Sequence, residues 1–140
     1  MAGVIVRRPT SAAGLVLRLL AAAGLAVDAY VHADLAPIYD GIHASIGQGS
    51  LFRIEAAVAS AAALIVLARG RRTGFGLAFV VAASALGAIL LYRYVNVGTL
   101  GPLPNMYEPA WYTEKTVAAV AEAAAAATAA CGLLWEVRHR

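Results

Sequence analysis

Asp28 and His32 are the two residues whose types and spacing point most directly to chemistry. They stand four positions apart in the stretch DAYVHADLAPIYDGIH, residues 28 to 43, which is polar in a chain that is otherwise rich in alanine, leucine, valine and glycine. Residues at i and i+4 lie on one face of an α-helix, so this carboxylate can contact this imidazole. Such a contact orients the ring as a metal ligand or as a proton acceptor.

The same stretch supplies a candidate metal set, made of His32, Asp34, Asp40 and His43. Two histidines with carboxylates are ligand types that suit zinc, copper or iron, so a divalent metal is a candidate cofactor that the sequence does not require. Pro37 and Gly41 interrupt the stretch, so the sequence leaves the relation of His32 to His43 open. The set also lacks a recognised ligand spacing such as HExxH. The preferred interpretation of residues 32 to 43 is therefore a wet polar loop.

Ionisable residues inside hydrophobic runs form a second group of candidates. A charge at the centre of a bilayer costs at least about 2.5–3.5 kcal/mol, so it usually faces a partner or a cavity. The polar outer site predicted on this basis contains Asp28, His32, Glu55, Arg93 and Glu122. One hypothesis pairs Arg93 with Glu55 or Glu122 and gives the pair a structural role. The other is a carboxylate-lined cavity, open to the outside, that binds a cation or passes protons.

The elements that must position these residues are hydrophobic runs. Of the 140 residues, 61% are hydrophobic and 14% are charged, which is far fewer charges than a soluble domain carries. Four runs, at about 11–31, 51–68, 74–95 and 112–135, are near the ~20 residues that an α-helix needs to cross a membrane. The first run could instead be a cleaved signal peptide, but it is longer than the roughly 7–15 residues of a signal h-region and contains Arg18, so we expect it to be retained. The sequence predicts an all-α, four-transmembrane-helix bundle that forms a single integral membrane domain over residues 1–140.

Basic residues predict the orientation of this bundle. With four crossings, eight of the eleven basic residues fall on one side: Arg7, Arg8, Arg18, Arg69, Arg71, Arg72, Arg138 and Arg140. The positive-inside rule then places both termini in the cytoplasm and residues 32–50 and 96–111 outside. We therefore expect a multi-pass protein of the plasma (inner) membrane. The basic residues are too scattered for a nucleic-acid partner.

Small residues predict close helix packing and partners within the membrane. Small-xxx-small spacing lets helix backbones approach one another in lipid. The residues in question are Gly14, Ala21 and Gly24 in the first run, and Ala83 with Gly87 and Ser84 with Ala88 in the third. The expected partners are membrane lipid and either further copies of the chain or other membrane subunits.

Two short sequence patterns resemble those of a known group of membrane proteins. His32-x-x-Leu35 followed by Tyr39, with Gly49-x-Leu51-Phe52 opening the second run, resembles small four-helix integral membrane proteins of high-GC actinobacteria. The resemblance extends over most of the chain. It implies a four-helix fold and a location in the cell envelope, but no activity and no catalytic residue.

Three functional hypotheses follow from the sequence. The first is a non-enzymatic accessory or scaffold subunit of a larger membrane assembly, because the chain is small and no catalytic motif stands out. The alternative is a protein that binds or transports a cation or metal through its acidic, histidine-containing outer face. The third is a membrane enzyme that binds a lipid or quinone, with Arg93 holding the polar head group.

Overall fold

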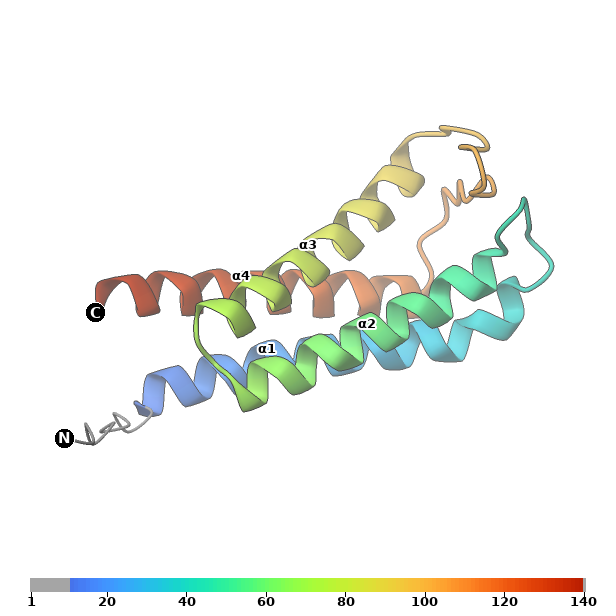
Figure 1. Cartoon of the computed structure of the whole chain (residues 1–140). Helices are drawn as coiled ribbons and strands as arrows, with labels where there is room; N and C mark the ends of the chain where they lie inside the picture. The colour runs from blue at the N-terminus through green and yellow to red at the C-terminus, as the bar shows by residue number, and fades with distance from the viewer. Residues whose placement is uncertain (1–10, 140) are drawn as a thin grey trace.

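The structure, a computed structural model, describes residues 11–139 and consists there of four long helices and one short 3-10 helix (Figure 1). The elements are α1 (Ala12–Leu35), η1 (Ala36–Tyr39), α2 (Gln48–Ala68), α3 (Arg72–Tyr94) and α4 (Thr113–Arg138). All four long helices are long and apolar enough to cross a membrane. The predicted all-α architecture with four membrane-length helices is therefore confirmed. Each of the four helices is longer than the run that predicted it.

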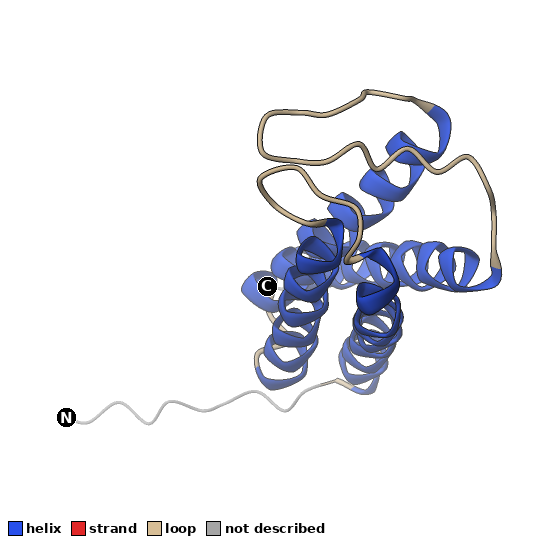
Figure 2. Ribbon diagram, turned by 90° about the vertical axis from the view of Figure 1, so that its right-hand side faces the viewer, coloured by secondary structure: helices blue, strands red, loops and turns tan. Residues whose placement is uncertain are grey.

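Successive helices run in alternating directions, which gives the bundle two distinct ends. The start of α1, the turn at residues 69–71 and the end of α4 lie at one end, called here the turn end (Figure 1). Residues 36–47 and 95–112 lie at the other, called here the loop end, as Figure 2 shows. The backbone N–H of Ile46 donates a hydrogen bond to the carbonyl of Pro102 over 2.9 Å, and this bond joins the two loop-end segments.

The helix α1 is the centre of the packing. It lies along both α2 and α4, whereas α3 packs mainly on α4 and less on α2. In Figure 1, α3 diverges from α4 towards the loop end. The helices α3 and α4 are therefore closer together at the turn end than at the loop end, where most of the polar residues lie.

The core is built mostly from alanine, because only small side chains allow the helix backbones to approach this closely. A Cβ atom added at Gly24 would lie 2.7 Å from the carbonyl oxygen of Ala121 and 2.9 Å from the Cβ of Ala125. This is the contact between α1 and α4 that the small residues of the first run predict. Gly87 and Ala88 on α3 are exposed instead, so association of that face with a partner or second copy stays a prediction.

Large apolar side chains cover the outside of the bundle. Leu64, Val80 and Val120, from three different helices, are each more than 60% exposed. A soluble protein rarely exposes apolar side chains so extensively, whereas lipid tails accommodate them. The outer surface is therefore that of a membrane-compatible bundle.

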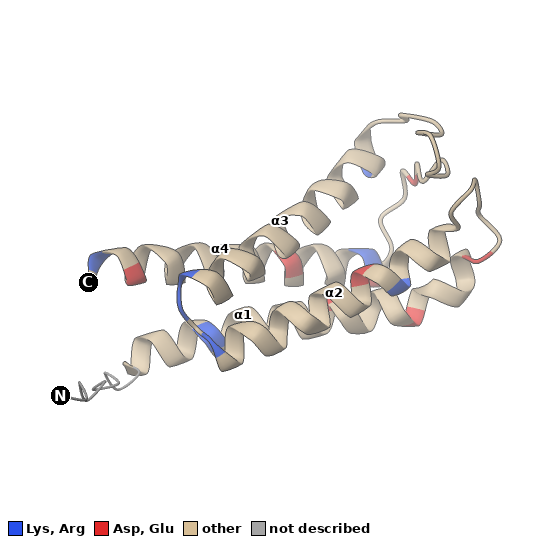
Figure 3. Ribbon diagram, viewed as in Figure 1, with Lys and Arg blue, Asp and Glu red and all other residues tan. Residues whose placement is uncertain are grey.

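Charged residues differ between the two ends (Figure 3). Arginines gather at the turn end, where Arg18 donates from Nε to the carbonyl of Val66 over 3.1 Å. Most of the described acidic residues lie in the half of the bundle nearer the loop end. Arg7, Arg8 and Arg140, which contribute to the predicted orientation, lie outside the described residues.

Candidate functional site: a buried carboxylate–histidine centre

Asp28, His32 and Glu122 form a cluster between α1 and α4, called here the carboxylate–histidine centre. One ligand-type atom from each residue lies within 4.8 Å of the other two, and this is the one such group among residues 11–139. Asp28 and Glu122 are fully buried, and His32 is partly buried. The fold therefore brings together four of the five residues predicted for the polar outer site, because Glu55 on α2 lies beside Asp28.

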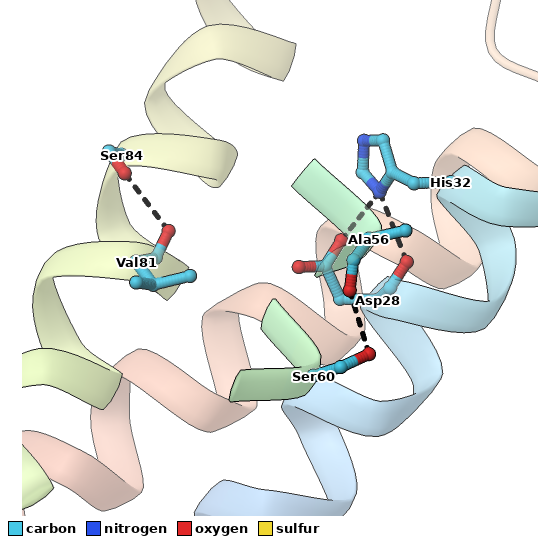
Figure 4. Close-up of polar contacts among 6 residues, drawn as sticks. All are labelled: Asp28, His32, Ala56, Ser60, Val81 and Ser84. Carbon is cyan, nitrogen blue, oxygen red and sulfur yellow. Dashed lines mark hydrogen bonds and ion pairs between the residues drawn. The ribbon is translucent and has the colours of Figure 1, made fainter. Parts of the chain in front are cut away.

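The contact between His32 and Asp28 confirms the expected i, i+4 pair. His32 Nδ1 lies 2.7 Å from Asp28 Oδ1 and 3.1 Å from the backbone carbonyl oxygen of Asp28 (Figure 4). Only the contact with the carbonyl has hydrogen-bond geometry, so the short approach to the carboxylate is an ion-pair contact without a well-aligned hydrogen bond. The second ring nitrogen points away from Asp28 (Figure 4). The imidazole thus has a fixed orientation, with Nδ1 facing Asp28 and Nε2 facing away from it.

The carboxylate oxygens of the centre lack hydrogen-bond partners. Both oxygens of Asp28 and both of Glu122 are buried without a hydrogen bond to any described residue, as is Oε1 of Glu55 on α2. A buried polar atom left unpaired usually costs about 1–3 kcal/mol, and more when it is charged. Native structures pair most such atoms with protein groups or ordered water, and the exceptions mark sites for a bound water or ion. The centre is therefore incomplete as a network of protein groups alone.

The basic side chains near the loop end do not complete it. The Arg93 guanidinium lies over the rings of Tyr94 and Trp111, 4.9 and 5.6 Å from their centroids. The Lys115 ammonium donates to the backbone carbonyls of Glu108 and Ala110, over 2.5 and 3.1 Å.

The predicted ion pair of Arg93 with Glu55 or Glu122 is absent from the described residues, so that prediction was wrong. Arg93 stands near the end of α3, where this helix diverges from α4, and its guanidinium stacks on aromatic rings instead.

The other three residues of the predicted metal set do not join His32. Asp34, Asp40 and His43 are exposed and belong to no group of ligand-type atoms among the described residues. Arg53 donates two hydrogen bonds to Asp40, over 2.7 and 2.8 Å, and thereby holds the pKa of this carboxyl below its ordinary value. The four-residue set is thus corrected to Asp28, His32 and Glu122, because His32 faces into the bundle and away from the loop.

A cavity of about 400 Å³ adjoins the centre in the loop half of the bundle. All four long helices line it, and His32 and Glu55 are part of its wall. Tyr39 and Tyr112 also line it and hydrogen-bond to each other through their hydroxyl groups over 2.8 Å. The imidazole of the centre can therefore be reached through this cavity.

The sequence contains one signal that would have found the cluster. Gly24 precedes Asp28 by one helical turn, and Ala121 and Ala125 flank Glu122. These small residues form a close contact between α1 and α4, so an acidic residue beside them is placed to face the other helix. Reading the small residues together with the acidic ones would have placed Asp28 opposite Glu122.

No protein family, curated protein or solved structure matches this chain. The resemblance to actinobacterial membrane proteins therefore stays a prediction, as does the hypothesis of an accessory subunit. Function has to be argued from the chemistry of the centre.

Proposed function

We propose that the protein is an integral membrane protein that binds a divalent cation at the carboxylate–histidine centre. The observation that carries the proposal is the set of four buried carboxylate oxygens, on Asp28 and Glu122, that have no hydrogen-bond partner among the described residues. Anionic oxygens that converge in a buried site attract a cation, and no ammonium or guanidinium group of residues 11–139 pairs with them.

Electrostatics supports a divalent ion. Two carboxylates at most 4.8 Å apart repel each other by at least about 3.5 kcal/mol at an effective dielectric constant of about 20. One divalent cation cancels the two negative charges of Asp28 and Glu122 while His32 binds as a neutral imidazole. The resulting site has no net charge, which is the favourable state within a membrane.

The ligand types favour zinc or a similar first-row metal. Imidazole nitrogen and carboxylate oxygen bind Zn²⁺ at about 2.0–2.2 Å, which sets tetrahedral ligand atoms about 3.4 Å apart. Three ligands leave a fourth position for water or for a group from the adjacent cavity. An open fourth position is typical of sites that exchange a ligand, whereas structural zinc sites use four protein ligands.

The charge distribution supports entry of the cation from outside the cell. The turn end carries five of the seven described arginines, so the positive-inside rule assigns this end and both termini to the cytoplasm of a plasma-membrane protein. The loop end, with the cavity that leads to His32, then faces the extracytoplasmic side. Between the centre and the turn end the described core is apolar, with Leu25, Val66 and Phe75 buried there. We therefore propose binding from the outside, in a conformation closed towards the cytoplasm.

The test is a zinc titration of protein purified without a metal-affinity tag, with a competing chelator to set the free concentration. We expect one zinc ion per chain. Replacing Glu122 with Gln should weaken the affinity at least about 100-fold, because loss of a ligand costs more than loss of an outer-shell partner. The matched control is Asp34→Asn, which removes an exposed carboxylate near the same end. The proposal fails if the wild-type protein binds no stoichiometric zinc, or if both variants bind it equally.

A further inference from the structure

The cavity beside the centre has the size and walls of a small-molecule site. Its volume of about 400 Å³ falls within the range of ligand pockets, about 300–1,000 Å³. Aliphatic side chains from all four helices form most of the wall, including Val31, Leu51 and Ile89. Ile54 also lines the cavity and is 57% exposed on the outer surface of α2, so the cavity reaches the side of the bundle that faces lipid. A ligand soluble in the membrane can enter there.

Two hydrogen-bond acceptors in this wall are unused. Gln48 Oε1 and Glu55 Oε1 are buried without a partner among the described residues, and the Gln48 side chain is only 5% exposed. The two residues stand seven positions apart on α2, which is two helical turns along one face. Their Cα atoms are separated by about 10.5 Å along the helix axis, at 1.5 Å per residue. The cavity therefore presents two acceptors in line on a single helix face.

The charges of the wall indicate a neutral head group. Glu55 and Glu108 line the cavity, so an anionic head such as a phosphate would face two carboxylates. Lys115 also lines it, but its ammonium is already bound to two backbone carbonyls and disfavours a second cation. A neutral head that donates hydrogen bonds is the chemistry that remains. The phosphate of a lipid and a free amine are both disfavoured.

Aromatic side chains favour a flat ring in this position. Phe52 lies edge-on to His32, with ring centroids 5.1 Å apart, and packs against Tyr39 at 4.9 Å. Aromatic groups arranged in this way receive another ring by offset or edge-to-face contact. Across a six-membered ring, two para hydroxyl oxygens about 5.5 Å apart, each extended by a hydrogen bond of about 2.7 Å, span about 11 Å. This span is close to the rise of about 10.5 Å between the Cα atoms of Gln48 and Glu55 along α2.

We propose that this cavity binds a membrane-soluble amphiphile whose head is a hydroquinone ring, with its two hydroxyl groups donating to Gln48 and Glu55. The apolar tail lies in the opening beside Ile54. The site lies away from Arg93, which lines no part of this cavity, so the predicted role of Arg93 in holding a head group is not needed. The proposal concerns binding alone and requires no cation at the carboxylate–histidine centre, although His32 belongs to both sites.

The test uses 2,3-dimethyl-1,4-naphthohydroquinone, kept reduced under anaerobic conditions, with zinc-free wild-type protein in lipid nanodiscs. Two reference compounds have the same ring skeleton: the oxidised quinone and the dimethyl ether, neither of which has a hydroxyl donor. Loss of two hydrogen bonds should weaken binding by tenfold or more. Equal affinity for the hydroquinone and the dimethyl ether would overturn the proposed head-group chemistry.

Variants locate the ligand. Ala88→Trp adds bulk to the cavity wall at an exposed position of α3 and should reduce hydroquinone affinity at least tenfold. Gly87→Trp is its matched control, because Gly87 does not line the cavity and a Cβ atom added there meets nothing within 4 Å. Glu55→Leu should also reduce affinity, whereas Glu114→Gln, at an exposed acidic residue, should not. Unchanged binding in Ala88→Trp would overturn the assignment to this cavity, even if Glu55→Leu does not fold.

Glu122→Gln separates this inference from the proposed function. The variant should lose zinc binding while it retains hydroquinone binding, because Glu122 is not part of the cavity wall. If zinc does not bind, a positive result for hydroquinone still stands. If hydroquinone does not bind, a positive result for zinc still stands. Loss of hydroquinone binding in a folded Glu122→Gln variant would contradict the separation of the two sites.

Discussion

Gly24→Ala should disturb both the stability of the bundle and its affinity for zinc. The added Cβ would lie 2.7 Å from the carbonyl oxygen of Ala121, whereas ordinary contacts begin at 3.4 Å. The helices α1 and α4 must therefore separate by about 0.7 Å at this level, one turn from Asp28. Overpacking costs about 1–3 kcal/mol, and the higher helix propensity of alanine returns about 1 kcal/mol. We expect a net loss of stability of about 1 kcal/mol, with a lower unfolding temperature in detergent.

The same separation should weaken zinc binding by about 10-fold or more, because metal–ligand distances tolerate deviations of only about 0.2 Å. Tryptophan fluorescence during heating measures stability, and the chelator-competition titration measures affinity. Gly87→Ala is the matched control, since it makes the same chemical change on α3 where an added Cβ meets nothing within 4 Å. If the two variants have equal stability and equal zinc affinity, the close contact of α1 and α4 does not set the geometry of the centre.

Two further predictions concern the ends of the bundle. Arg53→Ala should raise the pKa of Asp40 towards its ordinary value, because the two hydrogen bonds from Arg53 hold it down. Since the pKa of Asp40 is lowered in the folded state, the Arg53–Asp40 pair stabilises the protein above the ordinary aspartate pKa, and this stabilisation disappears as the pH falls through the lowered value. An NMR titration of the Asp40 carboxyl carbon in both proteins measures the change in pKa. An unchanged pKa in Arg53→Ala would contradict the prediction. In a Cys131→Ala background, a cysteine introduced by Ser45→Cys should react with an impermeant maleimide on intact cells, whereas one introduced by Arg71→Cys should react only after permeabilisation. The opposite labelling pattern would reverse the proposed orientation.

Much of the fold could be predicted from the sequence, because the length of a hydrophobic run alone determines whether a helix can cross a membrane. The ends of the helices were predicted less accurately than their number. The sequence places the first span at about 11–31, but α1 continues to Leu35 because the next break in the chain is Pro37, in η1. Residues 32–35 therefore belong to the helix, and His32 lies within it beside Asp28.

The candidate site was only partly predictable, for a physical reason. The i, i+4 contact of Asp28 and His32 depends on helix geometry alone, so the sequence predicts it. Asp28 and Glu122 are 94 positions apart in the sequence (122 − 28). Whether their side chains meet depends on how α1 and α4 are rotated about their axes and shifted along them relative to each other. The small residues Gly24 and Ala121 determine that register. Arg93 was misplaced because the divergence of α3 from α4 has no signal in the hydrophobic pattern.

The central claim is that a divalent cation binds between Asp28, His32 and Glu122. Zinc K-edge X-ray absorption of the zinc-loaded protein measures the ligand shell directly. The account predicts a mixed nitrogen and oxygen shell at about 2.0–2.1 Å with imidazole scattering, and loss of that scattering in His32→Ala. A shell of oxygen atoms alone, unchanged in His32→Ala, would contradict it.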